Sequence, residues 1–252
     1  MTPTFTVIVG TKCRPVLKDL LDSVQAQERI PGDQLIVSID SFERGPMTEV
    51  QEFVRSYGEG FVATDYDAGY HWLGVEQNNH VLRSIPMTGS HIFTVGDDDV
   101  FVEGAYKIIR RVCKEYPNRP IIYRFSAPNR AVLWDKPRVR ACLISGCCIA
   151  APVQYVGLHP TELETTHDYR WMMDILEKAR AAGHPPVFLD YVGVIARPDN
   201  RGQWKGIWTC PNWECNLWGF VDNGKLATCR CGIDLWDEQL NLQPRIVEEV
   251  RD

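Results

Sequence analysis

The chain has 252 residues and a formal net charge of -6, with 44% hydrophobic and 24% charged residues. This composition is that of a globular protein and excludes a disordered or fibrous chain. The acidic balance gives no overall attraction to nucleic acid or anionic lipid, although it is compatible with a local basic groove. The length allows one large α/β domain, with or without a small appendage.

The opening residues and the cysteines indicate where the protein resides. "MTPTFTVIVG" lacks the basic start and long apolar core of a signal peptide, and no apolar run reaches the roughly 18 residues that span a bilayer. The nine cysteines are odd in number, and five of them lack the spacing of metal ligands: Cys13, Cys113, Cys142, Cys147 and Cys148. We therefore expect a soluble protein of the reducing cytoplasm, without membrane insertion.

Predicted strands and helices alternate in the first part of the chain. Short apolar runs rich in β-branched residues predict buried strands at 5–10, 33–40, 61–64 and 91–96. Apolar residues at helical spacing predict helices at 14–27, 49–57 and 75–84. This alternation predicts a parallel sheet, in which ligands bind beyond the carboxyl ends of the strands. Asp40 and the aspartates 97–99 are predicted to lie at that edge.

The alternation continues to about residue 200. Amphipathic patterns predict helices at 103–116 and 167–183, the second of which ends at Gly183. Apolar runs predict strands at 120–126, 140–152 and 186–196. Small residues around Gly146 indicate that the middle strand packs closely against a neighbour. From residue 199 onward a loop-like stretch leads into a segment rich in tryptophan and cysteine.

The segment "HIFTVGDDDVF", residues 91–101, places three adjacent carboxylates directly after a predicted buried strand. Such a cluster can be a solvated turn, or it can bind a hard divalent cation that takes oxygen ligands. The apolar strand before it and the amphipathic helix behind it favour the cation. Mg²⁺ or Mn²⁺ needs only one or two protein carboxylates together with phosphate oxygens and water. The sequence therefore predicts that these aspartates bind one of the two ions.

Three segments resemble the family 2 glycosyltransferases of the GT-A fold. "FTVIVGTKCRPVLKDLLDSVQAQ" followed by "DQLIVSIDS" resembles the opening of these enzymes. "HIFTVGDDDVF" resembles their DxD region, in which aspartates bind a divalent metal and the diphosphate of the donor. The resemblance covers about residues 5–200 and rests on the order and spacing of several weak motifs. It implies an α/β fold with a Rossmann-like, mostly parallel sheet flanked by helices, and a nucleotide-sugar donor, with UDP-sugars first among them.

The resemblance also implies which residues contact the donor. Carried over by position, Gly10, Thr11 and Arg14 would lie near the nucleotide. Asp40, at the end of the second strand, would contact the base or the ribose.

Further donor contacts are implied by the DxD region and by the helix before it. Asp97 and Asp99 match the metal and diphosphate ligands, and Asp98 would face the sugar or share that role. The family often has an Ala-Arg-Asn run in the preceding helix, where this chain has "VEQNNHVL". Asn78 and Asn79 match the asparagine, and we take Asn79 as the donor-binding candidate. The arginine is absent, which leaves one contact to the diphosphate or the sugar unassigned.

A carboxylate base is implied as well, because family 2 enzymes that invert the anomeric centre use one to remove the proton of the acceptor hydroxyl. It usually belongs to a Glu-Asp pair at the start of a helix, and "TTHDYRW" at 165–171 occupies that place. We predict that Asp168 is this general base, while His167 replaces the glutamate and could orient the base or the acceptor. Alternatively, Thr165 or Thr166 caps the helix and Asp168 only complements the helix dipole.

The segment "ARPDNRGQW" lies where the family often has a mobile loop that closes over the diphosphate. Arg197 and Arg201 could neutralise the leaving group there, and Trp204 could stack on a base or a sugar. We take Arg201 and Trp204 as donor-binding candidates. The alternative is that the segment is a linker.

Four cysteines near the end of the chain are spaced as C-x4-C-x13-C-x-C: Cys210, Cys215, Cys229 and Cys231. Four thiolates on two hairpin-like ends suit a closed, tetrahedral structural Zn²⁺ site, and Asn223-Gly224 predicts a hairpin turn between the pairs. Disulfides are the alternative, although a cytoplasmic setting argues against them. A ribbon this small would depend on zinc for its folding free energy.

We therefore predict three regions: a GT-A domain at 1–204, a zinc-ribbon-like segment at 205–235 and a tail at 236–252. Within the GT-A domain, residues 1–99 would form the nucleotide-sugar half and 100–204 the acceptor half. The leading hypothesis is a metal-dependent, inverting glycosyltransferase whose acceptor is a glycan, a small molecule or a hydroxymethylated base in DNA. The alternatives are a nucleotidyltransferase, for which "GTKCRP" is a poor phosphate loop, and a non-catalytic zinc-ribbon binding module.

Overall fold

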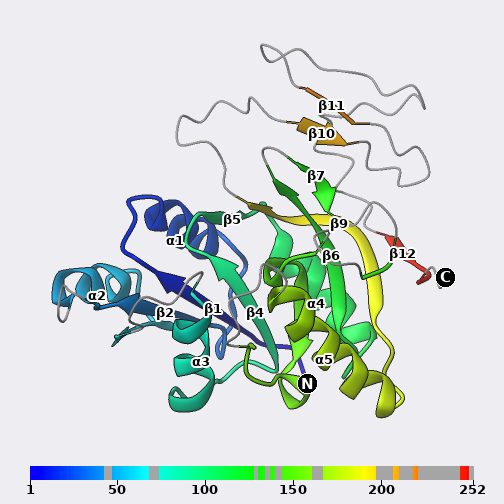
Figure 1. Ribbon diagram of the computed structural model, residues 1–252, viewed down its shortest axis with the longest axis horizontal. Helices are drawn as coiled ribbons and strands as arrows, with labels where there is room; N and C mark the ends of the chain where they lie inside the picture. The colour runs from blue at the N-terminus through cyan, green and yellow to red at the C-terminus, as the bar shows by residue number, and fades with distance from the viewer. Residues whose placement is uncertain are drawn as a thin grey trace.

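The computed structural model describes the following residues: 1–42, 47–67, 74–127, 130–133, 137–139, 144–160, 167–196, 207–209, 218–220 and 245–249. Their main feature is a mixed β-sheet flanked by helices (Figure 1). The strand order in this sheet is β12-β9-β6-β8-β4-β1-β2-β3, with β5 paired to β9 and β7 paired to β6. The fold class predicted from the sequence is thus confirmed at the level of an α/β sheet with flanking helices.

The first half of the sheet is entirely parallel. Its strands are β1 (Phe5–Thr11), β2 (Gln34–Asp40), β3 (Phe61–Tyr66) and β4 (His91–Gly96). They pair in the order β4-β1-β2-β3, so the carboxyl ends of β1 and β4 are neighbours. These four strands match the predicted ones, and β3 is two residues longer than expected.

Helices connect these strands and bury both faces of the sheet. They are α1 (Leu17–Gln25), α2 (Thr48–Arg55) and α3 (Val75–Ser84). Alternate residues of β1 face opposite sides: Val7 belongs to the same apolar cluster as α1, whereas Ile8 packs with Val81 of α3. Helix α1 begins three residues later than predicted, because Arg14, Pro15 and Val16 form the turn that precedes it.

The second half of the sheet is mixed. Its elements are β5 (Asp99–Phe101), α4 (Ala105–Glu115), β6 (Ile121–Ala127), β7 (Arg130–Leu133), β8 (Ile149–Pro152), α5 (His167–Ala181), β9 (Val187–Ala196) and β12 (Arg245–Val247). Strand β8 is antiparallel to both β4 and β6, whereas β6 and β9 are parallel. The expectation of a mostly parallel sheet is therefore wrong here. No α-helix separates β6 from β8 in the described chain, whereas α5 provides the crossover that a parallel β6–β9 pair requires.

A second correction concerns the strand predicted at 140–152. Within its described residues, the strand is only β8, and Gly146–Cys148 forms a 3₁₀ turn (η1) instead. The turn is fixed by tertiary contacts, since the buried Tyr123 donates its hydroxyl proton to the carbonyl oxygen of Cys147 at 2.7 Å. The predicted end of the long helix is confirmed: Gly183 has a φ of +79° and follows the last turn of α5.

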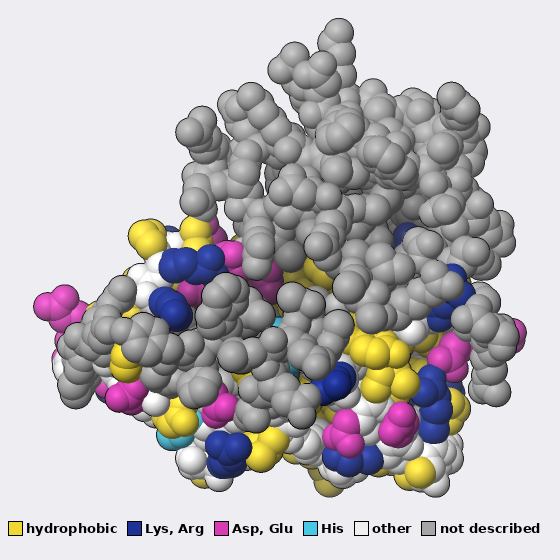
Figure 2. Space-filling model, viewed as in Figure 1, with side chains coloured by type: hydrophobic (Ala, Val, Ile, Leu, Met, Phe, Trp, Pro, Cys, Tyr) yellow, Lys and Arg dark blue, Asp and Glu magenta, His cyan; other side chains and the backbone are white. Residues whose placement is uncertain are grey.

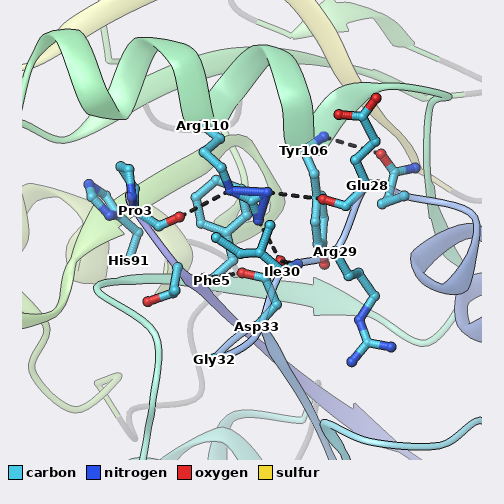
Figure 3. A network of polar contacts seen from close by, with 12 residues as sticks. Pro3, Phe5, Glu28, Arg29, Ile30, Gly32, Asp33, His91, Tyr106 and Arg110 are labelled. Carbon is cyan, nitrogen blue, oxygen red and sulfur yellow. Dashed lines mark hydrogen bonds and ion pairs between the residues drawn. The ribbon is translucent and has the colours of Figure 1, made fainter. Parts of the chain in front are cut away.

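The amino-terminal edge of the sheet is held by a buried ion pair between Arg110 and Asp33 (Figure 3). Arg110, on α4, also donates to the carbonyl oxygens of Pro3 and Glu28, each at 3.0 Å. Asp33 accepts the backbone N–H groups of Phe5 and Ile30, each at 2.9 Å. The network therefore joins α4, the start of β1 and the loop before β2, at the edge opposite to the predicted site.

Near the end of the chain, β10 (Ile207–Thr209) and β11 (Trp218–Phe220) form a separate antiparallel pair, drawn above β7 in Figure 1. The predicted zinc ribbon lies outside the described residues for the most part, including its four cysteines and its Asn223-Gly224 turn. Each described helix is too short or too polar to cross a bilayer.

Candidate active site

The ends of β1 and β4 bring Thr11 and Asp97 together. Gly10 and Gly96 are paired in the parallel register, so the next residue of each strand is Thr11 on one side and Asp97 on the other. Thr11 Oγ1 donates a hydrogen bond of 2.6 Å to Asp97 Oδ2. Asp97 is 3% exposed, so its carboxylate is fixed in a buried position at the carboxyl edge of the sheet.

Arg14 closes this cluster from the turn before α1. Its Nε donates to Asp97 Oδ1 at 3.0 Å, its Nη2 contacts the same oxygen, and its Nη1 donates to Asp98 Oδ2 at 3.0 Å. The hydrogen bond to Asp97 is the largest cause that raises the pKa of Arg14 well above its ordinary value. The guanidinium therefore stays charged and compensates one of the three adjacent carboxylates.

Asp99 turns back onto the end of β4. Its Oδ2 accepts the backbone N–H of Gly96 at 2.7 Å, and the residue then begins β5, where it pairs with Ala196 of β9. A Cβ at position 96 would lie 2.8 Å from Asp98 Oδ1 and 3.2 Å from Asp99 Oδ2. A side chain at position 96 would therefore displace these carboxylates from their present positions.

The chemistry of this cluster fits a hard divalent cation that is shared with a ligand. Arg14 pairs with Asp97 and Asp98, and Asp99 adds a third carboxylate, so the donor set is all oxygen and retains negative charge. Within the described residues, no group of three or more His, Cys, Asp or Glu side chains is arranged to hold a metal ion alone. An ion bound here would therefore need phosphate oxygens or water to complete its coordination.

Asp40, the donor-binding candidate on β2, is 6% exposed and lies at the end of its strand. Its Oδ1 accepts the backbone N–H of Phe42 at 3.0 Å, and its Oδ2 lies 4.0 Å from the ammonium nitrogen of Lys12. The carboxylate is thus oriented by the turn that follows β2. The ammonium of Lys12, 62% exposed, brings a positive charge from the loop after β1.

Between Gly10 and the start of α3, the backbones approach closely. A Cβ on Gly10 would lie 3.1 Å from the Cα of Gly74 and 3.2 Å from the Cβ of Gln77. Three buried atoms near this contact have no hydrogen-bond partner among the described residues. Gln77 Oε1 and Asn78 Oδ1 belong to α3, and Ser38 Oγ belongs to β2, where Ser38 pairs with Gly10. Neither Ser38 nor Gln77 belongs to a sequence motif, so neither could be singled out from the sequence.

Asn79 is held differently from the other donor-binding candidates. Its Nδ2 donates to the carbonyl oxygen of His159 at 3.0 Å, and its Oδ1 accepts the N–H of the same residue at 2.7 Å. The side chain is fully buried. In this structure Asn79 joins α3 to the segment after β8, and no described contact joins it to the aspartates.

The predicted base, Asp168, lies in the first turn of α5 and accepts three hydrogen bonds. Ser145 Oγ and the backbone N–H of Gly146 donate to its Oδ2 at 3.0 and 3.1 Å. His167 Nε2 lies 3.1 Å from its Oδ1. Ser145 and Gly146 were not predicted to contact it, since 23 and 22 residues separate them from Asp168 and no spacing rule connects them.

These contacts set the charge of Asp168. Burial tends to raise the pKa of the carboxyl group, but hydrogen bonding and charge from His167 and the N–H of Gly146 oppose it and lower the pKa to about 2. The side chain is 30% exposed, whereas that of His167 is 12% exposed. Asp168 is therefore ionised at neutral pH and is a weak proton acceptor.

The aspartate cluster and Asp168 are connected through buried residues. Burial raises the pKa of the Cys147 thiol well above its ordinary value, and the charges of Asp99 and Asp168 both add to this shift. A Cβ on Gly146 would lie 2.4 Å from Thr94 Oγ1, three residues before Asp97 on the same strand. Three residues of strand span about 10 Å. Asp168 is therefore connected to the strand that leads to the aspartate cluster through Gly146 and Thr94.

Arg201 and Trp204, with Arg197, lie outside the described residues, as do the four cysteines. Among the predicted residues, Thr11, Arg14, Asp97 and Asp98 are in direct contact, and Asp99 follows in the same turn. Asp168 is bound by a separate set of partners.

Comparison with known proteins gives structural matches only. No protein-family model matches the chain, and no curated protein matches it. TarS from S. aureus, residues 1–349 in complex with UDP-GlcNAc, has a TM-score of 0.61 and 16% identity; the match covers 80% of this chain and 60% of that one. The same protein in complex with UDP has a TM-score of 0.55 and 17% identity, covering 68% of this chain and 54% of that one.

A mannosyltransferase from Pyrobaculum calidifontis, in complex with GDP-Man and Mn²⁺, has a TM-score of 0.53 and 16% identity. The match covers 80% of this chain and 59% of that one. In each of these matches, this chain covers less than two thirds of the other protein's length. These structures are GT-A-type glycosyltransferases, and the chain shares their GT-A type of fold.

Proposed function

We propose that this protein is a glycosyltransferase that moves a sugar from a nucleotide-sugar donor to an acceptor hydroxyl. The observation on which the proposal depends is the cluster formed by Thr11, Arg14 and Asp97 at the adjoining ends of β1 and β4. It lies at the edge where open α/β sheets bind their ligands. The same fold occurs in structures that contain UDP-GlcNAc and GDP-Man.

The donor would bind across the ends of β1, β2 and β4. Gly10, Thr11 and Arg14 would contact the nucleotide and its phosphates, and Asp40 would contact the base or ribose. Asn79, Arg201 and Trp204 remain candidates for further contacts. A UDP-sugar is the first donor to test, because two of the structural matches contain UDP or UDP-GlcNAc.

Asp97 and Asp99 would hold Mn²⁺ or Mg²⁺, with Asp98 facing the sugar or sharing the role. A Mn²⁺ ion is present in the mannosyltransferase complex with GDP-Man. Such an ion supplies positive charge that stabilises a leaving diphosphate. In this chain, Arg14 would supply a second positive charge from the opposite side of the cluster.

We propose that transfer inverts the anomeric centre, because Asp168 provides a carboxylate close to the donor edge. Direct displacement needs one group that accepts the proton of the acceptor hydroxyl and positive charge that stabilises the leaving group. The three hydrogen bonds to Asp168 fix its carboxylate in one orientation. A group that accepts a proton during transfer has to be held in position in this way.

The acceptor would be a glycan, a small molecule or a hydroxymethylated base in DNA. On the face shown in Figure 2, acidic and basic side chains of the described residues are interspersed rather than gathered into a basic surface. From residue 205 to the end, the chain has five Lys and Arg against eight Asp and Glu. These charges favour a glycan or a small molecule over DNA.

The four cysteines at 210, 215, 229 and 231 would bind one structural Zn²⁺ in the segment 205–235, apart from the aspartates. Thiolates prefer zinc, whereas carboxylates prefer magnesium or manganese, so the two sites should be chemically separable. Metal analysis of the purified protein tests this: one zinc per chain is expected. Disulfides between these cysteines in freshly purified, reduced protein would contradict it.

The proposed activity is tested with a panel of UDP- and GDP-sugars. Each is added with and without Mn²⁺ while thermal unfolding is followed, because a ligand that binds the folded state raises its apparent stability. We expect one donor to raise the melting temperature in a metal-dependent way and to be hydrolysed slowly with water as acceptor. Stabilisation by nucleoside triphosphates with no response to any sugar nucleotide would favour a nucleotidyltransferase instead.

A further inference from the structure

We infer that the guanidinium of Arg14 competes with the divalent cation for Asp97, and that Arg14, once displaced, binds the diphosphate of the donor. This inference rests on the metal site and the nucleotide-sugar donor proposed above, and adds that cation and donor bind in a coupled way. It follows from the contacts at the ends of β1 and β4, where Arg14 bridges Asp97 and Asp98.

The carboxylate of Asp97 is largely used by the protein itself. Its Oδ1 accepts two N–H groups of Arg14, from Nε at 3.0 Å and from Nη2, and its Oδ2 accepts the hydroxyl of Thr11 at 2.6 Å. An ionised carboxylate offers about four acceptor positions, so three of them are taken. A divalent cation on the same carboxylate would also be repelled by the guanidinium, which is permanently charged. Arg14 therefore has to release Asp97 before a cation can bind there.

The position of Arg14 allows this exchange. Its side chain is 50% exposed, whereas those of Asp97 and Asp98 are 4% and 17% exposed. Within the described part of the chain, its guanidinium donates to these two carboxylates. Arg14 can therefore move toward solvent when a cation takes its place, while the aspartates stay at the end of β4.

Arg110 is an arginine that is held in a different way. It also pairs with a buried carboxylate, that of Asp33, but its own side chain is only 10% exposed. It donates in addition to the carbonyl oxygens of Pro3 and Glu28, each at 3.0 Å (Figure 3). Backbone acceptors thus fix Arg110 in a structural network. The guanidinium of Arg14 is held by carboxylates that a cation can take over.

A displaced Arg14 would have a new partner in the donor. The residue lies in the turn between β1 and α1, at the edge where open α/β sheets bind their ligands. A guanidinium binds phosphate oxygens through two parallel N–H···O bonds. The diphosphate would therefore replace the carboxylates as the partner of Arg14.

This exchange has a thermodynamic consequence. A cation that binds without a diphosphate breaks the contacts between Arg14 and the aspartates, and Arg14 gains only water in return. A cation that binds together with a diphosphate lets Arg14 form new charged hydrogen bonds. Each of the two ligands should therefore raise the affinity for the other, and by the same factor.

The first test measures cation binding and needs no donor. Mn²⁺ is titrated into the metal-free protein while the electron paramagnetic resonance signal of the free ion is followed. In Arg14→Gln the competing charge is absent, so the dissociation constant for Mn²⁺ should fall by about 10–100-fold, the range that corresponds to hydrogen bonds with a charged group. This gain should disappear when Asp97→Asn is added. An unchanged or higher dissociation constant in Arg14→Gln would overturn the inference.

Lys18→Gln is the matched control. Lys18 lies on α1, is exposed and pairs with Asp22 on the same helix, so the substitution removes one positive charge without touching the aspartate cluster. It should keep the parental dissociation constant for Mn²⁺, which separates competition from a change in net charge. Arg14→Lys should give an intermediate value, because an ammonium group keeps the charge but lacks the planar fork that bridges two carboxylates.

The second test measures the coupling. Calorimetry gives the affinities for UDP and GDP with Mn²⁺ and in metal-free buffer, for the parent and for Arg14→Gln. In the parent, Mn²⁺ should raise the affinity for the diphosphate that binds, and in Arg14→Gln this factor should be smaller by about 10-fold or more. An equal factor in both proteins would overturn the transfer of Arg14 to the diphosphate. A parent that binds neither UDP, GDP nor any sugar nucleotide would instead overturn the proposed function, while the Mn²⁺ titration would still decide the competition.

Discussion

Gly146 donates its backbone N–H to Asp168 at 3.1 Å, and it does so from a position where no side chain fits. A Cβ at residue 146 would lie 2.4 Å from Thr94 Oγ1 on β4. The orientation of Asp168 therefore depends on how closely η1 packs against the strand that leads to the aspartate cluster. This contact connects the two parts of the candidate site.

We predict that Gly146→Ala displaces η1 and disturbs Asp168. The added methyl group overpacks the contact with Thr94, which should cost about 1–3 kcal/mol in the free energy of unfolding. Because Gly146 of η1 and Ser145, just before it, both donate to Asp168, transfer activity should fall as well. Denaturant unfolding and the rate of diphosphate release measure the two effects.

A second substitution, made at Thr94 in the Gly146→Ala variant, tests whether the contact with Thr94 causes the loss of stability. Thr94→Ala makes room for the new methyl group, so the double variant should regain part of the lost stability. Thr94→Val is the matched control, since it fills the same space and Thr94 Oγ1 has no hydrogen-bond partner among the described residues. Equal stability of the two double variants would show that the contact with Thr94 is not the cause.

The first half of the fold could be predicted from the sequence because each element has a complete local pattern. β1 and β4 contain apolar runs that lead to Gly10 and Gly96, and α3 occupies the predicted residues 75–84. The second half depends on contacts between distant residues. Strand β5 is only three residues long and follows from pairing with β9, and η1 depends on Tyr123 and Thr94. No local pattern in the chain encodes these contacts.

In the candidate site, too, some features could be predicted from the sequence and others depend on contacts between distant residues. Parallel strands end at one edge, so the sequence could place Thr11 and Asp97 at the same edge of the sheet. Their contact depends on the pairing of β1 with β4, which no local pattern encodes. The partners of Asp168 could not be predicted, because Ser145 and Gly146 reach it through the turn before β8. Asn79 could be matched to a motif, but its burial and its two hydrogen bonds to His159 are tertiary features.

We predict that Asp97→Asn abolishes the metal-dependent stabilisation by a sugar nucleotide while the fold is kept. The amide oxygen can still accept the hydrogen bond from Thr11, and Arg14 is half exposed, so water can solvate it. The melting temperature without ligands should therefore change little. Asp174→Asn removes the same charge from an exposed pair with Lys178 on α5 and should respond to donor and Mn²⁺ like the parent. An unchanged response of Asp97→Asn would remove Asp97 from the proposed metal ligands.

The network around Arg110 predicts a large effect far from the site. Arg110→Leu leaves the side chain of Asp33, which is 1% exposed, without its cation, so stability should fall by about 3–5 kcal/mol. Adding Asp33→Asn should recover part of this, because it removes the uncompensated buried charge. Recovery is incomplete, since Phe5 N–H and Ile30 N–H bind different oxygens of Asp33 and asparagine has only one.

The control for this pair lies on the same helix. Lys107 forms an exposed ion pair with Glu28, and Lys107→Leu should cost less than about 1 kcal/mol. Urea unfolding of the four proteins gives the comparison. If Arg110→Leu and Lys107→Leu cost the same, the buried pair is not essential for the amino-terminal edge of the sheet.

The last prediction concerns the dependence of stability on pH. Burial lowers the pKa of His159 to about 4, from an ordinary value of 6.5. Above pH 6.5 the ring is neutral in both folded and unfolded chains. As the pH falls from 6.5 to 4, the unfolded chain takes up a proton that the folded chain cannot, so the free energy of unfolding decreases, by about 3 kcal/mol at most. Below pH 4 both states are protonated and this contribution no longer changes.

His159→Phe should remove this contribution. Phenylalanine can keep the stack on Trp171, and neither ring nitrogen of His159 has a hydrogen-bond partner among the described residues. We expect the variant to be at least as stable as the parent at pH 7 and to lose less stability between pH 6.5 and 4. Part of the slope should remain, because burial also lowers the pKa of His91 to about 4. Urea unfolding at a series of pH values measures both slopes, and identical slopes would mean that His159 is protonated in the folded protein as readily as in the unfolded chain.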